Sequence, residues 1–574
     1  PDARSVLGNE AMISRWPARG GPVVCDDVVY FAAGIWPSEG IFIYALDAAT
    51  GGVRWQNVDS GAIYMPQPHP TAEARSGVAA QGYLAVAGDR LFVPTGRAVP
   101  ACFDRHTGAF QYFHLQQYGQ NGEALAMVVN DVFFNGGLAF DVAQGTAIGK
   151  LGPGQLAAST AGVVRTAGTT VAEYVWREEE KPDRKGEPET VRTLVATWSR
   201  DGVPAAHTMA TAGSQVILGG TDRIVLVDSA AQDVVWEAPV EGTACGLAVC
   251  GGQLLASTDR GAIYCFVSAA AAAPSSPAGS ATLAAADQSG ASPAADQAAD
   301  LILQRTGVQA GYCLDLGCGT GDLALAQRAN LQIVAVDPDA ENVRRARERL
   351  AAAGLYGTRV TVQQRDLADT GYPAYFADLI VSGRSLERDV EAAVAQEAAR
   401  MLRPCGGVRC WGRADQLDIV TRGALEGAGS WTHQYADAAN TVNSGDALVR
   451  GALGMLWFRD LDFDVPSRHG RAPAPLAAEW RLIHEGLDGL VAVNAYNGRE
   501  LWRYSIPNVL KAYHGDELMG VAGTGSNMCI GGERLYVASD HRCAQLDIAT
   551  GQVTAEFTTA AGTDGRARPW GYLA

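Results

Sequence analysis

The sequence predicts a mainly β chain built from repeated four-strand units and interrupted by one α/β domain. Short alternating apolar runs joined by tight turns recur along most of the 574 residues. Glycine is abundant at 67 residues while charged residues make up only 19%, a balance typical of short strands and turns. Between about residues 301 and 412 the pattern changes to strands alternating with helices, which predicts a parallel sheet.

The repeated unit has two parts. The first is a run of alternating apolar residues around a polar or glycine turn, as in GPVVCDDVVYFAAG (21–34) and SNMCIGGERLYVAS (526–539). The second is a strand, an Asp or Asn, a short turn that usually carries Gly, and another strand, as in IYALDAATGGVRW. In four units an aromatic follows the acid or amide by eight residues: Trp55 after Asp47, Tyr112 after Asp104, Trp236 after Asp228, and Trp502 after Asn494.

This spacing has a structural rationale. The Asp or Asn side chain can accept backbone N–H groups of its own turn, Gly can supply a positive φ, and the aromatic can pack between neighbouring sheets. Four strands per unit make the blade of a propeller. The D-x-x-T-G-x-x-x-W pattern resembles the pyrroloquinoline-quinone (PQQ) repeat, and the resemblance implies a seven- or eight-bladed PQQ-like β-propeller.

The composition predicts four segments along the chain. We expect a first propeller part at 1–266, an Ala/Ser/Pro/Gly-rich linker at 267–292, an inserted domain at 293–413 and a second propeller part at 414–574. The final RPWGYLA resembles the start of a hairpin unit, and the first twenty residues lack a preceding hairpin. We therefore expect a protein partner or a missing chain segment to complete the propeller.

The inserted domain opens with a glycine-rich loop, LDLGCGTGDLA (314–324), directly after a predicted strand. Further strands are predicted in LQIVAVDPD, RVTVQQRDL, FADLIVSG and GGVRCWG, with helices between them. Ligands bind such sheets at the carboxyl ends of the strands. The order and spacing of these elements resemble the class I S-adenosylmethionine-dependent methyltransferases, which have a Rossmann-like fold.

The resemblance implies an S-adenosylmethionine site at this edge of the sheet. The family's first motif, where backbone approaches the methionine part of the cofactor, matches Asp315, Gly317, Gly319 and Gly321. Asp337 matches the acid that accepts hydrogen bonds from the ribose hydroxyls. Asp366 and Leu367 match the residues that lie beside the adenine ring. Ser382 and Gly383 follow the fourth strand, where substrate and cofactor would meet. No residue is identified as a catalytic base.

Each motif residue also has a plainer interpretation. A glycine loop can close any strand-to-helix turn, and Asp337 in DPD can cap the following helix. A phosphate-cradling loop is not expected, because no GxxxxGK[ST] sequence is present and the glycine spacing is GxGxG.

Composition excludes some classes of function. A formal charge of −17 argues against binding to nucleic acid. The sequence contains no run of eighteen or more apolar residues, so no transmembrane helix is predicted. The opening residues PDARSVLGNE do not have the pattern of a signal peptide. No metal site is expected, and His469, His484 and His514 are interpreted as solvent-facing or hydrogen-bonded.

Three functions are consistent with the sequence. In the first, the inserted domain methylates an unknown small molecule or protein presented by the propeller. In the second, the chain is a non-catalytic interaction scaffold with a vestigial methyltransferase fold. The third, a quinoprotein dehydrogenase, ranks last: those enzymes need a convergent Ca²⁺ carboxylate set and often carry an adjacent Cys-Cys pair, so PQQ and Ca²⁺ are not expected.

Segments such as GSWTHQYADAANT (429–441) resemble large exported planctomycete-type proteins that join a methyltransferase-like domain to a propeller. This resemblance implies a periplasmic or extracellular location. The alternative is the cytoplasm, where S-adenosylmethionine is made.

Overall fold

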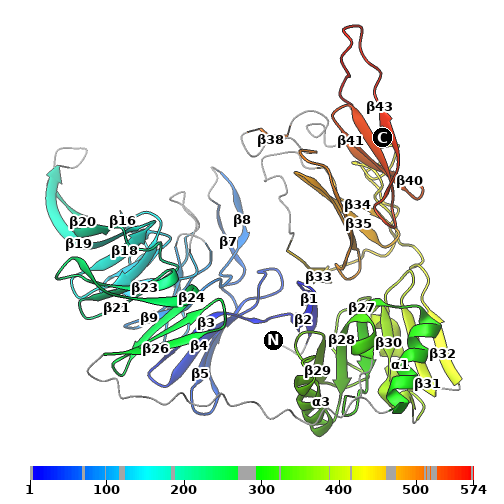
Figure 1. The fold of residues 1–574 in the computed structure, drawn as a ribbon, viewed down its shortest axis with the longest axis horizontal. Coiled ribbons are helices and arrows are strands. Elements are labelled where there is room, and N and C mark those ends of the chain that lie inside the picture. Colours follow the sequence, from blue (N-terminus) through cyan, green and yellow to red (C-terminus); the bar gives the residue numbers. More distant parts are fainter. Residues whose placement is uncertain are drawn as a thin grey trace. The chain divides into compact units, whose positions relative to one another are not determined.

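The chain forms two compact units, one of Trp16–Ser280 and one that joins Pro1–Arg15 to Ala281–Ala574. Both are shown in Figure 1, and each is considered by itself. The computed structural model describes residues 4–67, 71–96, 99–114, 123–182, 188–268, 293–321, 325–386, 388–413, 416–460, 473–509, 512–513, 517–518, 526–570 and 573.

Antiparallel sheets of four or more strands dominate the unit Trp16–Ser280 (Figure 1). The four-stranded sheets are β3 (Ala18–Cys25), β4 (Val28–Ala33), β5 (Phe42–Asp47), β6 (Val53–Asn57); β9 (Ala85–Ala87), β10 (Arg90–Val93), β11 (Ala101–Asp104), β12 (Phe110–Tyr112); β13 (Met127–Val129), β14 (Val132–Asn135), β15 (Leu138–Asp141), β16 (Ala147–Lys150); and β17 (Gln155–Ala158), β18 (Val163–Ala167), β19 (Thr170–Pro182), β20 (Pro188–Asp201). A two-stranded hairpin consists of β7 (Ile63–Pro66) and β8 (Glu73–Ser76).

A six-stranded sheet follows in the same unit. Its strands are β21 (Thr208–Ala212), β22 (Gln215–Gly219), β23 (Thr221–Asp228), β24 (Asp233–Cys250), β25 (Gln253–Thr258) and β26 (Ile263–Val267). The long strand β24 pairs with β23 through its first half and with β25 through its second half. It is therefore the outer strand of one blade and the inner strand of the next.

The other unit contributes two more blades. Their strands are β34 (Leu476–Ala478), β35 (Arg481–Gly486), β36 (Gly489–Asn494), β37 (Glu500–Ser505), and β40 (Met528–Gly531), β41 (Arg534–Ser539), β42 (Arg542–Asp547), β43 (Val553–Thr558). A short pair, β38 (Ala512–Tyr513) and β39 (Glu517–Leu518), lies between them in sequence. With β24–β26 counted as a three-stranded blade, the described residues hold eight blade-like units, within the predicted range.

The turn chemistry of the repeat is confirmed. Asp47 Oδ1 accepts the backbone N–H of Thr50 at 3.0 Å and the Thr50 hydroxyl at 2.9 Å, and Gly51 has φ +70°. Asp104 and Asp547 make the same contacts in their own turns. The acid therefore fixes the turn that joins the third and fourth strands of a blade.

Three of the four repeated aromatic rings lie on the turn glycine of the next blade. Trp55 Nε1 donates to Arg105 O at 2.8 Å, and a Cβ at Gly108 would lie 2.4 Å from the Trp55 ring. The same contact joins Tyr112 to Gly145, and Trp502 to Gly551. Glycine is required at these turns because a side chain would occupy the space of the ring, and this explains why the repeat pairs Gly with an aromatic.

The inserted domain is a six-stranded sheet with the order β29-β28-β27-β30-β31-β32. Its elements are α1 (Pro293–Thr306), β27 (Ala310–Leu316), α2 (Leu325–Arg328), β28 (Asn330–Asp337), α3 (Ala340–Ala352), β29 (Val360–Gln364), β30 (Leu379–Val381), the 3-10 helix η1 (Gly383–Leu386), α4 (Ala392–Met401), β31 (Val408–Arg413) and β32 (Gln416–Thr421). The strands β27–β31 are parallel, as predicted.

The sheet extends beyond the boundary predicted at residue 413. Strand β32 pairs antiparallel with β31, from Arg413 opposite Gln416 to Val408 opposite Thr421. Its sequence, QLDIVT, alternates apolar and polar residues as a propeller strand does, so composition alone assigned it to the propeller.

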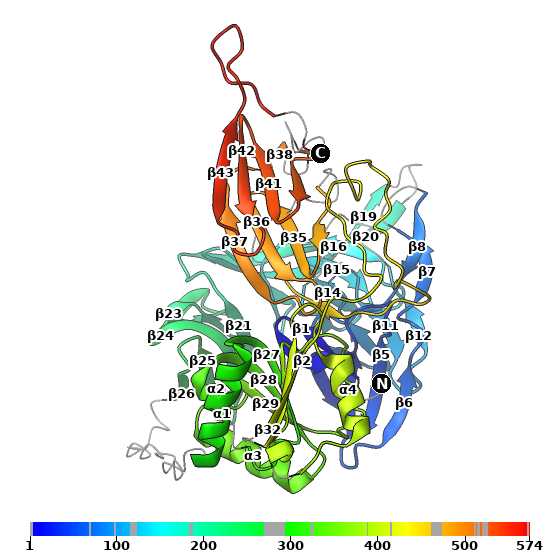
Figure 2. The same ribbon diagram turned by 90° about the vertical axis from the view of Figure 1, so that its right-hand side faces the viewer.

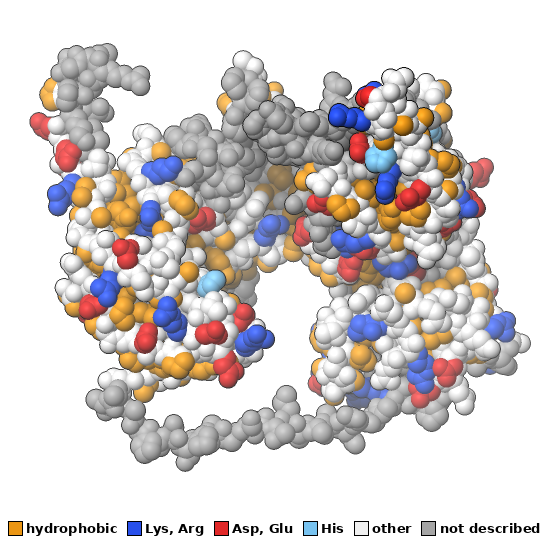
Figure 3. Space-filling view, turned by 45° about the horizontal axis from the view of Figure 1, so that its top comes forward, with side chains coloured by type: hydrophobic (Ala, Val, Ile, Leu, Met, Phe, Trp, Pro, Cys, Tyr) orange, Lys and Arg blue, Asp and Glu red, His pale blue; other side chains and the backbone are white. Residues whose placement is uncertain are grey.

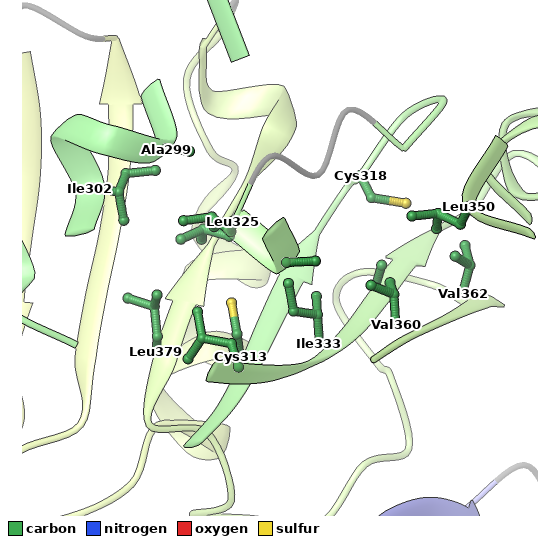
Figure 4. Packing of buried hydrophobic residues seen from close by; sticks show 14 of the residues in the cluster. Ala299, Ile302, Cys313, Cys318, Leu325, Ile333, Leu350, Val360, Val362 and Leu379 are labelled. Carbon is green, nitrogen blue, oxygen red and sulfur yellow. The ribbon is translucent and has the colours of Figure 1, made fainter. Parts of the chain in front are cut away.

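Helices α1, α2 and α3 cover one face of this sheet, and α4 lies on the other side (Figure 2). Ile302 of α1, Leu325 of α2 and Leu350 of α3 pack with Cys313 and Ile333 of the central strands. Figure 4 shows these side chains converging on that face.

The N-terminal residues cover the opposite face together with α4. The sheet β2-β1-β33 is formed by β1 (Ser5–Gly8), β2 (Ala11–Ser14) and β33 (Trp457–Phe458). Leu7 and Met12 are buried in the same cluster as Val394 and Met401 of α4. The sequence assigned residues 1–15 to the propeller, whereas the structure packs this hairpin on the inserted domain.

The amino-terminal edge of the inserted sheet is joined to the blade β34–β37. Asp378 directly precedes β30, and its carboxylate accepts hydrogen bonds from Tyr312 N–H at 3.0 Å and Arg403 Nε at 2.6 Å. It also accepts a hydrogen bond at 3.3 Å from Asn497 Nδ2 of the blade. The Arg403 guanidinium also lies 4.9 Å from the ring centroid of Trp480. These contacts lie at the amino-terminal edge of the strands, opposite the carboxyl-terminal edge from which the glycine-rich loop leaves.

On the face shown in Figure 3, acidic and basic side chains of the described residues are interspersed. Within the described ranges, no helix is long and apolar enough to cross a membrane.

Candidate cofactor site

The glycine-rich loop leaves β27 at the carboxyl edge of the sheet. Gly317, Gly319 and Gly321 all have positive φ, at +87°, +56° and +81°. The N–H groups of Gly317 and Cys318 donate to Val336 O at 2.8 and 3.0 Å, which ties the loop to the end of β28. Residues 322–324, the end of the quoted motif, lie outside the described residues.

The three glycines have different surroundings. A Cβ at Gly321 would lie 2.9 Å from Ala346 Cβ, so this glycine lets the loop pack closely on α3. Among the described residues, no atom would lie within 4 Å of a Cβ at Gly319, so they leave this part of the loop open. A Cβ at Gly317 would lie 2.6 Å from Arg384 Cδ, because the Arg384 side chain crosses this glycine.

Asp315 lies behind the loop. Its Oδ1 accepts the Gly383 N–H at 3.0 Å, which ties β27 to the start of η1. Burial raises the pKa of Asp315 to about 6, and the nearby charge of Asp337 contributes to the same rise. Asp315 is only 4% exposed, so it positions the backbone of the site and does not face the open side of the loop.

Asp337 ends β28 and is fully buried. Its Oδ2 accepts Gly319 N–H at 3.1 Å, and its Oδ1 accepts Asp339 N–H at 3.0 Å and Asn342 Nδ2 at 3.2 Å. Helix α3 is capped by Asp339, which accepts the N–H groups of Glu341 and Asn342. The capping alternative for Asp337 is therefore wrong, because the neighbouring acid performs that role.

One basic residue that the sequence analysis missed also reaches Asp337. Arg384 Nη2 lies 3.6 Å from Asp337 Oδ1, an ion pair longer than a hydrogen bond. The only sequence signal was its place two residues after Ser382, where the fourth strand meets the site.

The remaining predicted residues differ in their access to this edge. Asp366 is exposed, and its Oδ1 accepts Ala368 N–H at 2.8 Å. Leu367 is buried in the core that α4 and the N-terminal hairpin share, so its side chain points away from the site. Ser382 Oγ donates to Leu316 O at 2.6 Å, which commits this hydroxyl to joining β30 with β27.

The loop that carries Asp366 is held by the N-terminal hairpin. Arg365 Nη2 donates to Ser5 Oγ at 3.0 Å, and Ser5 N–H donates to Gly371 O at 2.8 Å. Arg365 also donates to Thr370 O at 3.0 Å. Residues at the start of the chain therefore shape one wall of the site, a contact that no local pattern could predict.

Among the described residues, no three His, Cys, Asp or Glu side chains gather in a metal-binding group. His484 is partly buried, and this burial lowers its pKa. His469 and His514 lie outside the described residues.

Two family models match parts of the chain. Residues 313–406 match the family model of a methyltransferase domain, and residues 38–269 match a model described as outer membrane protein assembly factor BamB. No curated protein matches the chain.

Three solved structures resemble parts of the chain. A candidate S-adenosyl-L-methionine-dependent methyltransferase from Methanococcus maripaludis is 32% identical over 21% of this chain and 55% of its own, with a TM-score of 0.20. A candidate sarcosine dimethylglycine methyltransferase from Galdieria sulphuraria is 28% identical over 20% of this chain and 44% of its own, with a TM-score of 0.19. BamB from Moraxella catarrhalis is 14% identical over 47% of this chain and 93% of its own, with a TM-score of 0.28.

The chain spans about half the length of the methyltransferases it matches. The two family models and the described sheets together show that this chain joins a BamB-like, PQQ-type β-propeller to an inserted methyltransferase domain.

Proposed function

We propose that the inserted domain binds S-adenosylmethionine at the carboxyl edge of its sheet and transfers a methyl group to a small-molecule or protein acceptor. The observation that carries the proposal is the open backbone at Gly319 beside the carboxylate of Asp337. Glycine with positive φ at this position leaves no side chain between the loop and a ligand. The match of residues 313–406 to a methyltransferase domain supports the same assignment.

The residues at this edge fit such a cofactor. Among the described contacts, Asp337 Oδ2 accepts a single hydrogen bond, from Gly319 N–H, so a hydroxyl could also donate to this oxygen. The backbone of residues 317–321 would hold the amino-acid part, and Asp366 would lie beside the adenine. The other residue predicted beside the adenine, Leu367, would contribute only its backbone, because its side chain is buried in the core.

When bound, the cofactor supplies an electrophilic methyl group. The residues described here bind and orient it; Asp315 and Ser382 hold the strands through buried hydrogen bonds and so remain out of reach of an acceptor. Because Asn497 of the blade β34–β37 contacts the amino-terminal edge, an acceptor at the carboxyl edge approaches from the side away from that blade.

Calorimetric titration of the full chain with S-adenosylmethionine tests the proposal. We expect binding, and we expect Gly319→Ala to weaken it at least tenfold, because the new methyl group enters the open side of the loop. Gly354→Ala is the matched control: it has φ +69°, also finds no atom within 4 Å, and follows α3 away from the loop. Asp337→Asn is expected to weaken binding too, with a melting curve to check folding.

A non-catalytic scaffold is the second candidate. The observation that favours it is the Arg384 side chain, which lies across Gly317 where a ligand would rest. If titration of the folded protein with S-adenosylmethionine gives no heat of binding, that result would support the scaffold and would contradict cofactor binding.

Location is part of the proposal. The family model that residues 38–269 match is described as an outer membrane assembly factor, and this favours the periplasm. A cytoplasmic chain would instead have direct access to S-adenosylmethionine. Fractionation of cells that express the full-length gene distinguishes the two locations.

A further inference from the structure

Arg384 lies in η1, directly after the strand β30. Its backbone N–H donates to Gly317 O at 3.1 Å, so the start of η1 is fixed against the glycine loop. From there its side chain passes over Gly317, with Cδ 2.6 Å from the place of an absent Cβ. The guanidinium then reaches the end of β28, where Nη2 lies 3.6 Å from Asp337 Oδ1. One side chain thus crosses the carboxyl ends of three adjacent strands.

The charges explain this position. Asp337 has no exposed surface, and the three hydrogen-bond donors that it has among the described residues are uncharged N–H or amide groups. A buried carboxylate without a cation is costly, so a guanidinium at this distance stabilises it. The Arg384 side chain is itself 29% exposed, so it can leave the contact without breaking a buried network.

We propose that Arg384 is an internal competitor of the cofactor, holding the site closed by lying across Gly317 and against Asp337, in the space that the cofactor would use. This inference rests on the proposed function. In the closed state Arg384 lies on Gly317 and faces Asp337; in the open state it turns to solvent and the nucleoside takes its place. The apparent dissociation constant then equals the intrinsic constant divided by the fraction of open protein.

The expected effect is modest and measurable. A partly exposed ion pair stabilises by at most about 1 kcal/mol, which converts to roughly a fivefold change in affinity. Removing the guanidinium should therefore tighten binding of S-adenosylmethionine by about two- to fivefold. The change should appear without any new contact to the ligand, because the substitution removes atoms only.

Calorimetry on the full chain, with S-adenosylmethionine as the probe, tests this. We expect Arg384→Ala to bind more tightly than the unaltered protein and Arg384→Lys to fall between them. Arg388→Ala is the matched control, since Arg388 is exposed, lies four residues further on and has no ion pair to Asp337 among the contacts of the described residues. Higher salt should tighten binding to the unaltered protein, and Arg384→Ala should lose this dependence.

The outcomes separate this inference from the function on which it rests. Binding that is equal or weaker in Arg384→Ala, while the unaltered protein binds, overturns the competitor role and leaves the cofactor site intact. Weaker binding would mean that the guanidinium contacts the ligand. Failure of every folded variant to bind, with melting curves that match the unaltered protein, overturns both proposals.

Discussion

Removing Asp378 should loosen the inserted domain from the blade that holds it. The Asp378 carboxylate belongs to a residue that is 3% exposed, and it accepts hydrogen bonds from Tyr312, Arg403 and Asn497. Asp378→Ala leaves Arg403, which is 8% exposed, without its carboxylate partner. Breaking a buried pair by removing one partner costs about 3–5 kcal/mol.

The structure places the expected loss near the lower end of that range. Arg403 Nη1 keeps its bonds to Pro404 O at 2.9 Å and Cys405 O at 2.8 Å, and the Trp480 ring remains beside the guanidinium. We therefore expect a loss of about 3 kcal/mol. At about 2–4 °C per kcal/mol, the melting temperature of this unit should fall by roughly 6–12 °C.

Scanning calorimetry of the full chain measures the shift. Asp378→Asn should lose less, because its amide oxygen can still accept one bond. Asp564→Ala is the control: Asp564 is exposed and pairs with Arg568 at the surface, where such pairs contribute little. A shift below about 2 °C in Asp378→Ala would refute the reasoning, and so would a change in cofactor affinity, since this contact lies at the opposite edge of the sheet.

Three further predictions concern other parts of the chain. Leu7→Ala should destabilise the inserted domain by about 3 kcal/mol, because the Leu7 side chain is buried with α4. Protease cleavage within 293–421 should then become faster, and an unchanged cleavage rate would contradict this packing. Gly108→Ala should cost about 1–3 kcal/mol more than Gly51→Ala in urea unfolding: φ is similar at +74° and +70°, but only Gly108 lies under a Trp ring, so equal losses would show that the ring plays no part. Burial raises the pKa of Glu485 to about 8 from an ordinary value of 4.5, so the folded state keeps a proton that the unfolded state releases, and stability should fall as pH rises from about 4.5 to 8. Glu485→Gln should remove a loss of stability of about 5 kcal/mol over that range, measured as the urea midpoint against pH, and a pH dependence that persists would contradict the assignment.

Local patterns predicted the elements that depend on neighbouring residues. The acids of several repeats bind their own turns as their chemistry suggested, and three of the four repeated aromatics lie on a turn glycine. The glycine loop likewise follows β27 and meets the end of β28, because strand, loop and acid lie close in sequence.

Contacts between residues far apart in the chain could not be predicted from local sequence patterns. The packing of Leu7 against α4 joins residues far apart in the chain, and a four-residue strand gives no sign of its partner. Leu367 was placed beside the adenine by its position in a motif, whereas its apolar side chain is buried in the core. Arg384 was missed because a single basic residue in a turn usually points to solvent, and its ion pair depends on the buried charge of Asp337.

A crystal structure of the full chain with S-adenosylmethionine tests whether the cofactor binds along the glycine loop and displaces Arg384. We expect the adenosyl group beside Gly319 and Asp337, with the Arg384 side chain turned away from Gly317. A complex at saturating cofactor that shows Arg384 still facing Asp337 and no ligand along the loop would contradict this expectation.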